Sequence, residues 1–412
     1  MRYGEPMPML KAMRSRWHLA MGRGLRRVGR HDWALPHFEA VIELYPQHLF
    51  AHFLLGGSQL AVKQYEKAVA TFDRALEIAP GRAYAHAHKG ISCMYLGRHQ
   101  EAVYGLERAF RIQQKYRTSH RYVEALAQCY FSLGQFESAL ENYRLAERLS
   151  PRNSESASRV GGTLFKLERF HEAEAPLRRA ISLDASNADA SYCLALTLYQ
   201  TRRFDESVDI LKSMAARYPE RSDVHIAIAI NYKGEGRSAD ALAALGESLR
   251  VEPDNPEAYL QLAVAYGEDC KWEEALAAGK RLAELRPKEE IGYLTMAGAY
   301  HELKKHEEAI DACHQALRVN PKWPSALESL ASSYAEIGRY GEAAEALKRA
   351  IQIIPQAPHL RASLAEAYVE LGDFQAATVE QRALRNLDPT LATDVEKFIA
   401  ARAGRQDNLN LL

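Results

Sequence analysis

Prolines recur along the chain at a spacing of 34 residues. Pro46 and Pro80 show this step, and it continues through Pro219, Pro253, Pro287, Pro321, Pro355 and Pro389. From Pro80, two steps of 34 and an insertion of three residues near 117–119 lead to Pro151. A fixed period of this length is typical of repeat proteins. The chain is therefore predicted to fold as a stack of similar units.

Eleven units follow from this spacing and occupy residues 15–391. Their expected first residues are Ser15, Leu49, Ala83, His120, Ser154, Ala188, Ser222, Pro256, Glu290, Pro324 and Pro358. The remaining parts are predicted as a basic N-terminal segment at 1–14, a C-terminal capping helix at 392–404 and a flexible tail at 405–412.

Each unit contains two helical patterns separated by a short turn. In the unit that starts at Pro324, apolar residues recur at the i, i+3, i+4, i+7 spacing of an amphipathic helix until Gly338 interrupts them. A second such pattern follows and ends before Pro355, because proline cannot continue a helix. The sequence thus predicts one helical hairpin per unit and an all-α fold.

Small residues occupy two positions of the unit. The eighth position is Gly or Ala in all eleven units, and the twentieth is Ala in ten units, with Ser207 as the exception. A larger side chain at a close helix contact would overpack it. We therefore predict that the two helices of each hairpin cross closely at these positions.

The combined pattern resembles the tetratricopeptide repeat, a helix–turn–helix unit of the same length. The matching residues are Leu55, Gly56, Ala68, Phe72 and Pro80 in one unit and Leu262, Ala263, Tyr266, Ala275 and Pro287 in another. Other residues replace the family's tryptophan at the fourth position. The resemblance implies a right-handed α-α superhelical solenoid of helical hairpins. The strict step argues against the RNA-binding pentatricopeptide repeat, whose unit is one residue longer.

Charge and cysteine content exclude several classes of protein. The chain has 53 basic and 53 acidic side chains, so its net charge gives no general attraction to nucleic acid. Five scattered cysteines without CxxC spacing argue against a disulfide framework and suit a reducing compartment, so a cytoplasmic location is expected. The sequence has no apolar run long enough for a membrane span, and contact with a membrane is expected only at the periphery, if at all.

The repeats leave no room for a catalytic domain. The chain has no Walker loop, GxGxxG, HExxH or GxSxG motif. We therefore expect no enzymatic activity, no cofactor and no metal site. The cysteines are interpreted as small core residues and the histidines as surface or half-packed residues.

The resemblance implies that the first helices of the units line a concave groove, with positions 2, 5, 9, 12 and 13 facing it. Large apolar residues at solvent-facing positions predict a binding surface. The predicted groove residues are Phe50, Phe53, Tyr84, Ile91, Tyr95, Tyr192, Leu196, Tyr199, Ile226, Ile230, Leu260 and Val264. The alternative is that tight winding or the neighbouring second helices cover these side chains.

Charge is graded along the same positions. A basic surface comes first, at Arg16, Arg23, Arg26 and Arg27. An acidic end comes last, at Glu328, Glu336, Glu366 and Glu370. No unit combines the Lys and Asn of the family's carboxylate-clamp type, and the Asn ladder of its sugar-transferase type is missing. Recognition is therefore expected to use apolar pockets that accept a peptide or an amphipathic helix.

These features favour a non-catalytic scaffold or adaptor that binds a partner protein, as a peptide or helix, in the concave groove. Two alternatives stay open: an accessory or regulatory subunit of an enzyme or secretion/assembly machine, and a self-assembling structural coat protein. The opposite charges of the two ends also leave a homo-oligomer open. Nucleic acid is not expected as a partner, because few aromatic residues are interleaved with the N-terminal arginines.

Overall fold

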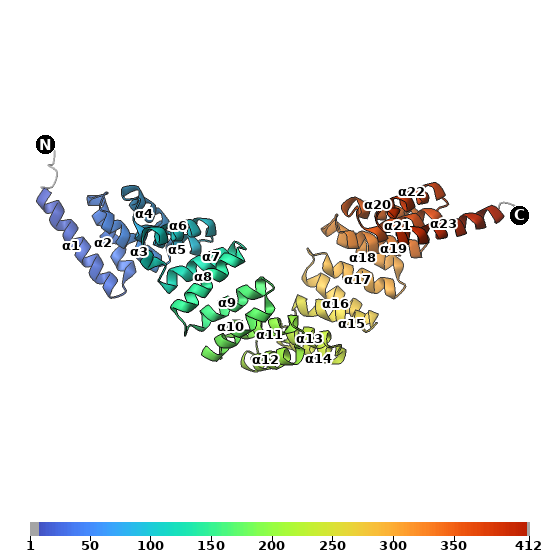
Figure 1. The fold of residues 1–412 in the computed structure, drawn as a ribbon, viewed down its shortest axis with the longest axis horizontal. Helices are drawn as coiled ribbons and strands as arrows, with labels where there is room; N and C mark the ends of the chain where they lie inside the picture. Colours follow the sequence, from blue (N-terminus) through green and yellow to red (C-terminus); the bar gives the residue numbers. More distant parts are fainter. Residues whose placement is uncertain (1–7, 410–412) are drawn as a thin grey trace. The chain divides into compact units, whose positions relative to one another are not determined.

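The computed structural model describes residues 8–409, and all regular secondary structure in this range is helical (Figure 1). The chain divides into two compact units, Met1–Ile210 and Leu211–Leu412. The boundary between them falls inside α12 (Phe204–Arg217). Each unit is built from consecutive helices that pack in pairs.

The first unit contains eleven complete α-helices and one short 3₁₀ helix within the described residues. They are α1 (Pro8–Arg27), α2 (His31–Leu44), α3 (Leu49–Ala61), α4 (Tyr65–Ile78), α5 (Ala83–Tyr95), α6 (His99–Ile112), η1 (Gln114–Tyr116), α7 (His120–Ser132), α8 (Phe136–Leu149), α9 (Ser154–Lys166), α10 (Phe170–Leu183) and α11 (Ala188–Gln200).

The second unit continues the same pattern. Its helices are α13 (Ser222–Gly234), α14 (Ser238–Val251), α15 (Pro256–Glu268), α16 (Trp272–Leu285), α17 (Ile291–Glu302), α18 (His306–Val319), α19 (Pro324–Glu336), α20 (Tyr340–Ile353), α21 (Pro358–Glu370), α22 (Phe374–Arg385) and α23 (Pro389–Leu409).

Each predicted repeat corresponds to one helical hairpin, and the all-α solenoid fold is confirmed. We call the first helix of each hairpin its A helix and the second its B helix. The predicted starts at Leu49, Ala83 and His120 are the first residues of α3, α5 and α7. The predicted insertion near 117–119 directly follows η1, whose Tyr116 is buried. The repeat period thus locates the helices along the chain.

The turn inside every hairpin uses one residue with a positive φ angle. Glycine fills this position six times, for example at Gly97 and Gly338, with φ near 75°. The other five hairpins place a residue with a side chain there, such as Lys304 at φ 60°. The left-handed conformation is easy for glycine and costs other residues free energy. The turn geometry is therefore maintained even where the sequence does not favour it.

The close crossing predicted from the small residues is confirmed. A Cβ at Gly90 of α5 would lie 2.9 Å from Cγ of Leu106 and 3.0 Å from the carbonyl oxygen of Ala102, both on α6. Ala102 occupies the twentieth position of its unit and is fully buried, as Ala68 is in the preceding unit. Small side chains at both positions allow the A and B helices to approach closely.

The ends of the described chain are helical. Residues 8–14, within the predicted basic segment 1–14, form the first turns of α1. The predicted capping helix 392–404 lies within the longer α23, which starts at Pro389 and includes residues 405–409. The Asp388 carboxylate accepts hydrogen bonds from the backbone N–H groups of Thr390 and Leu391, both at 3.0 Å, so it caps this helix. The predictions for residues 1–7 and 410–412 fall outside the described residues.

Candidate functional site

Side chains from four successive A helices of the first unit meet on one surface. Gly57 of α3 is central, because a Cβ there would lie 2.8 Å from the Tyr84 hydroxyl oxygen and 3.4 Å from a guanidinium nitrogen of Arg26. The lack of a side chain at Gly57 therefore lets both polar groups approach the α3 backbone. We call the following set the N-terminal groove cluster: Arg26, Phe53, Gly57, Tyr84, His88 and Tyr122.

Aromatic rings connect the helices within this cluster. The ring centroids of Phe53 and Tyr84 are 5.2 Å apart and the rings are tilted by 46°. Tyr84 also stacks on His88, with centroids 3.9 Å apart and an interplanar angle of 25°. Such aromatic pairs stabilise beyond the area they bury. The cluster is thus a continuous row of contacting aromatic rings that extends from α3 to α5, with Phe53 and Tyr84 half-buried and His88 buried.

His88 is held in one tautomer by its two hydrogen bonds. Its Nδ1 lies 2.9 Å from the Tyr84 carbonyl oxygen, which can only accept, so Nδ1 carries the proton. Its Nε2 lies 3.3 Å from the Tyr122 hydroxyl, which therefore donates to it. The pKa of His88 is lowered to about 4, with burial as the largest cause; the Tyr84 hydrogen bond opposes this shift, and the nearby Arg121 and Arg26 contribute to it. The ring is neutral near pH 7.

Two exposed aromatic side chains lie on the same A helices as the cluster. Phe50 is 46% exposed, and the Arg23 guanidinium lies 5.8 Å from its ring centroid. Tyr95 is 56% exposed and stacks on Tyr65, with centroids 4.8 Å apart and an interplanar angle of 15°. Both rings are held in place by a neighbour and keep a free face, which is the property of an interface anchor.

Two of the predicted groove residues do not reach the surface. Ile91 is 2% exposed and packs in a core cluster with Cys93, Leu106 and Leu126. Ile226 is 6% exposed. Their side chains cannot contact a partner, although their positions in the repeat are those predicted to face the groove. The exposure of a given repeat position therefore varies from unit to unit.

The remaining predicted groove residues are not members of the cluster. On α11, Tyr192 and Leu196 are half-buried, and Tyr199 packs on Phe204 with ring centroids 5.5 Å apart. The other three belong to the second unit, where Val264 is exposed while Ile230 and Leu260 are half-buried. The structure brings Phe53 and Tyr84 into contact, whereas these six residues have no part in that cluster.

The basic surface predicted on the first repeat lies on α1. Arg16, Arg23 and Arg27 are exposed, whereas Arg26 is half-buried beside Gly57 and Tyr84. One arginine therefore joins the N-terminal groove cluster directly, and Arg23 contacts Phe50 beside it.

Three residues of this surface were missed by sequence reasoning. His88 was treated as one of many scattered histidines, and Tyr65 and Tyr122 lie outside the positions predicted to face the groove. His88 is separated from Tyr122 by 34 residues, the repeat period, and this spacing is a signal that neighbouring units place the two side by side. The Tyr65–Tyr95 stack joins a B helix to an A helix, which the groove positions alone do not indicate.

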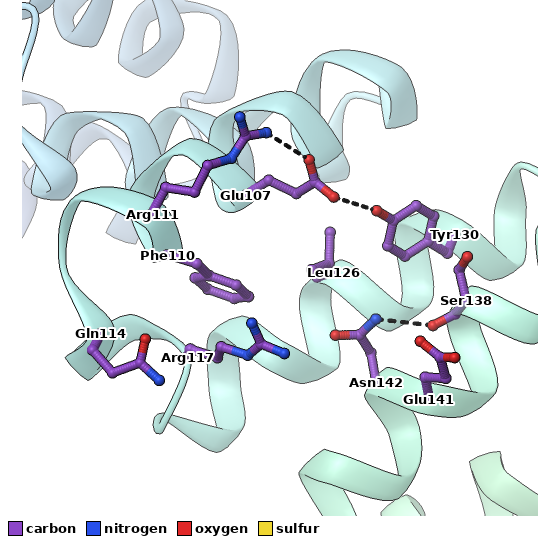
Figure 2. Close-up of a pocket in the computed structure, with 10 residues that line it drawn as sticks. All are labelled: Glu107, Phe110, Arg111, Gln114, Arg117, Leu126, Tyr130, Ser138, Glu141 and Asn142. Atoms are coloured by element: carbon purple, nitrogen blue, oxygen red, sulfur yellow. Dashed lines mark hydrogen bonds and ion pairs between the residues drawn. The ribbon is translucent and has the colours of Figure 1, made fainter.

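A polar hollow of about 480 Å³ lies where the insertion separates the third and fourth repeats (Figure 2). Glu107 accepts a hydrogen bond from the Tyr130 hydroxyl at 2.6 Å and pairs with Arg111 at 3.0 Å. Burial, and then this hydrogen bond, raises the pKa of Tyr130 to about 12. In Figure 2, Arg117 extends from the inserted loop toward Phe110 and Asn142. The inserted loop thus borders a hollow beside the B helices α6 and α8, and none of the N-terminal groove cluster lines it.

The second unit contains an acidic hollow of about 540 Å³. It is lined by the four glutamates of the predicted acidic end: Glu328, Glu336, Glu366 and Glu370. Burial raises the pKa of Glu366, and Glu370 pairs with Arg402 of α23 at 2.6 Å. The hollow also contains apolar side chains, among them Phe398. The chain's own C-terminal helix therefore contributes to this hollow.

The prediction that all five cysteines are core residues is wrong for one of them. Cys93, Cys129 and Cys313 are buried and Cys193 is half-buried, but Cys270 is exposed. Cys270 occupies the left-handed turn position, with φ 55°, where most hairpins have glycine. Residues 8–409 contain no group of three His, Cys, Asp or Glu side chains arranged to hold a metal. In that range no helix is both long and apolar enough to cross a membrane.

Comparisons with known proteins agree on the repeat type. The family model described as "Cilia and flagella-associated protein 70 C-terminal domain" matches residues 83–293, just over half of the chain. Models described as "Tetratricopeptide repeat" match residues 19–83, 289–356 and 335–395. No curated protein matches the chain.

Several solved structures are similar in fold. Yeast Tom70 is 14% identical over 95% of this chain and 96% of its own, with a TM-score of 0.46. A tetratricopeptide repeat protein from Parabacteroides merdae is 15% identical over 60% of this chain and 98% of its own, with a TM-score of 0.47. MamA is 22% identical over 42% of this chain and 94% of its own, with a TM-score of 0.39.

Family matches cover the chain from residue 19 to residue 395, a range that the structure forms from consecutive helices. The chain therefore belongs to the tetratricopeptide-repeat proteins, and its residues 83–293 fit the family described as the Cilia and flagella-associated protein 70 C-terminal domain.

Proposed function

We propose that this protein is a non-catalytic scaffold that binds a segment of a partner protein along the A helices of its first unit. Tetratricopeptide-repeat proteins are generally protein-interaction scaffolds. The observation that carries the proposal is the N-terminal groove cluster with its exposed neighbours Phe50 and Tyr95.

The chemistry of this surface indicates the kind of segment it fits. Phe50, Phe53 and Tyr84 offer aromatic faces, and Arg23 and Arg26 add two cations beside them. An extended peptide or an amphipathic helix with apolar side chains and nearby carboxylates would match both properties. Aromatic and arginine side chains contribute most of the binding energy in many protein interfaces. We expect a partner segment of this composition.

The test uses residues that are exposed, so that the fold is preserved. The variant Phe50→Ser/Tyr95→Ser removes two side chains that are 46% and 56% exposed. The matched control is Tyr104→Ser on the B helix α6, where a tyrosine is 66% exposed. Each protein is immobilised, partners are captured from native lysate, and their amounts are compared by quantitative mass spectrometry.

We expect a partner that binds the wild type and the Tyr104→Ser control equally and binds the double variant at least about tenfold less. The captured partner is then divided into overlapping peptides, and the peptide that binds is titrated against all three proteins. Equal binding to all three would contradict the proposed surface. If only Tyr104→Ser lost the partner, the binding surface would lie on the B helices instead.

A further inference from the structure

Helix α1 exposes a row of large apolar side chains. Ser15 and Gly22 are buried on the side of α1 that faces α2, and a Cβ at Gly22 would lie 2.6 Å from the Phe38 ring. Five apolar residues elsewhere on the helix are between 42% and 77% exposed: Met9, Leu10, Met13, Trp17 and Met21. We call these five residues the α1 outer stripe.

The α1 outer stripe forms one continuous face of the helix. At about 100° per residue, its five side chains fall within an arc of about 120°, opposite Ser15 and Gly22. Ala20 and Gly24 fall within the same arc and are also exposed. A surface helix normally presents polar residues on the side away from its hairpin partner. Trp17 contacts α2 through His37, with ring centroids 5.5 Å apart, yet it is 55% exposed. Packing within its own hairpin therefore does not account for the apolar face of α1.

The charges of α1 are all of one sign. The helix contains Lys11, Arg14, Arg16, Arg23, Arg26 and Arg27 and no Asp or Glu. Within residues 8–409, none of these six cations has an ion-pair partner. By the same helical geometry, Arg14 lies at one edge of the stripe, and Arg16, Arg23 and Arg27 lie at the other. An apolar face flanked on both sides by cations complements a surface that is apolar inside and anionic outside.

We propose that α1 docks this protein on an anionic membrane surface, with the helix lying parallel to the bilayer. Helices that rest in the lipid interface combine an apolar face with a cationic polar face. Flexible Met and Leu side chains suit the acyl boundary, and Trp17 suits the headgroup level, where tryptophan is enriched. The flanking arginines extend their apolar stems along the stripe and place their guanidinium groups at the lipid phosphates.

This site goes beyond the partner-binding surface, and its five apolar residues are not used there; Arg23, which flanks the stripe and contacts Phe50, is shared by the two surfaces. No member of the α1 outer stripe belongs to the N-terminal groove cluster, which uses Arg26 of α1. The stripe and the groove can therefore be tested by separate variants. If this protein used both surfaces at once, it would bring its partner protein to the membrane.

The test is co-sedimentation of the full chain with vesicles of phosphatidylcholine alone or mixed with phosphatidylserine. We expect the wild type to bind the mixed vesicles, to bind neutral vesicles weakly, and to be released as salt is raised. The variant Met13→Gln/Trp17→Gln should lower affinity for the mixed vesicles by about tenfold or more. The matched control is Val379→Gln on α22, because Val379 is 57% exposed, and it should bind as the wild type does.

A second variant distinguishes loss of membrane binding from loss of the fold, because it is expected to raise vesicle affinity. Gly24 lies in the middle of the arc, and apart from the adjacent backbone of α1 no described atom lies within 4 Å of a Cβ placed there. Gly24→Leu should therefore extend the stripe and raise vesicle affinity several-fold. Vesicle binding that is unchanged by both variants would overturn the proposal. A second result would also overturn it: the wild type does not bind vesicles and forms a dimer in analytical ultracentrifugation, and Met13→Gln/Trp17→Gln dissociates this dimer. The stripe would then be covered by a second copy of the chain.

Discussion

The aromatic ring of Phe72 occupies the space that a side chain at Gly56 would need. A Cβ at Gly56 would lie 2.8 Å from two atoms of that ring, whereas carbon atoms in contact are normally at least about 3.5 Å apart. Phe72 is fully buried, so it has little freedom to move aside. The first repeat shows the same arrangement between Gly22 and Phe38. A large side chain at the position of Phe72 and Phe38 therefore requires glycine at the position of Gly56 and Gly22.

We expect Gly56→Ala to lower the free energy of unfolding by about 1–3 kcal/mol, because the added methyl group overpacks the α3–α4 contact. Without that contact the sign would be reversed, since alanine favours a helix over glycine by about 1 kcal/mol. Gly24→Ala is the control, because apart from the adjacent backbone of α1 a Cβ there meets no described atom within 4 Å, and this change should stabilise the protein. Urea unfolding followed by circular dichroism measures both.

The double variant Gly56→Ala/Phe72→Leu tests the volume argument further. The corresponding positions of the tenth repeat hold Ala331 and Leu347, both buried in one core cluster. We expect the leucine to recover part of the stability lost by Gly56→Ala. A double variant that is less stable than the sum of the two single changes would show that the positions do not compensate for each other.

The buried His88 should make stability depend on pH. Its pKa is lowered from 6.5 to about 4 in the folded state, with burial as the largest cause. Between these values the unfolded chain binds a proton at this residue and the folded chain does not, so stability falls as pH falls below 6.5. The loss is complete below pH 4 and approaches about 3 kcal/mol. Above pH 6.5 the residue has no such effect.

The measurement is the free energy of unfolding as a function of pH for wild type and His88→Gln. The wild type should lose about 3 kcal/mol more than the variant between neutral pH and pH 4. His171→Gln is the control, because His171 is exposed, and its profile should follow that of the wild type. Parallel profiles for wild type and His88→Gln would contradict the burial of a neutral ring.

Replacing a turn residue that has a left-handed conformation and a side chain with glycine should increase stability. Lys304 has φ 60° and an exposed side chain, whereas Gly338 has φ 75° at the same position of the next hairpin. Lys304→Gly should stabilise by about 0.5–1 kcal/mol, because relief of the left-handed strain exceeds the entropy that glycine adds to the unfolded chain. Gly338→Ala should destabilise by about 1 kcal/mol. Thermal unfolding checks both signs, and a loss of stability in Lys304→Gly would refute the strain argument.

The five cysteines should differ sharply in reactivity. Burial raises the pKa of Cys93 and Cys193 to about 11 and that of Cys129 and Cys313 to about 12. Cys270 is exposed in a turn. Because the thiolate is the reactive form, one thiol per chain should react rapidly with Ellman's reagent in the folded protein, and all five should react in denaturant. Cys270→Ser should abolish the rapid reaction; a rapid phase that persists would mean that a buried cysteine becomes accessible.

Much of the fold could be predicted because the determining information is local and repeated. The spacing of Pro46, Pro80 and the later prolines located the hairpins, and the observed starts of α3 and α5 agree with the predicted Leu49 and Ala83. The small residue at Gly90 correctly predicted the close contact with α6. Each of these features depends only on neighbours within one repeat.

The surface was predicted less well, because exposure depends on packing between repeats. Ile91 and Val264 occupy the same position of their units, yet Ile91 is 2% exposed and Val264 is 38% exposed. The difference comes from the side chains around each site, which a repeat position does not specify. The insertion beside Arg117 was found in the sequence, but the hollow next to it depends on the distance between helices.

The amino-acid pattern alone was sufficient for the all-α repeat fold, its period and its close helix crossings, since burial of each amphipathic helix requires them. Three-dimensional packing was needed to bring Arg26 and Tyr84 together over Gly57, to stack Tyr84 on His88 and to hold His88 neutral. It was also needed to show which apolar residues of α1 stay exposed. These properties arise from contacts between side chains of different repeats, whose distances no sequence spacing contains.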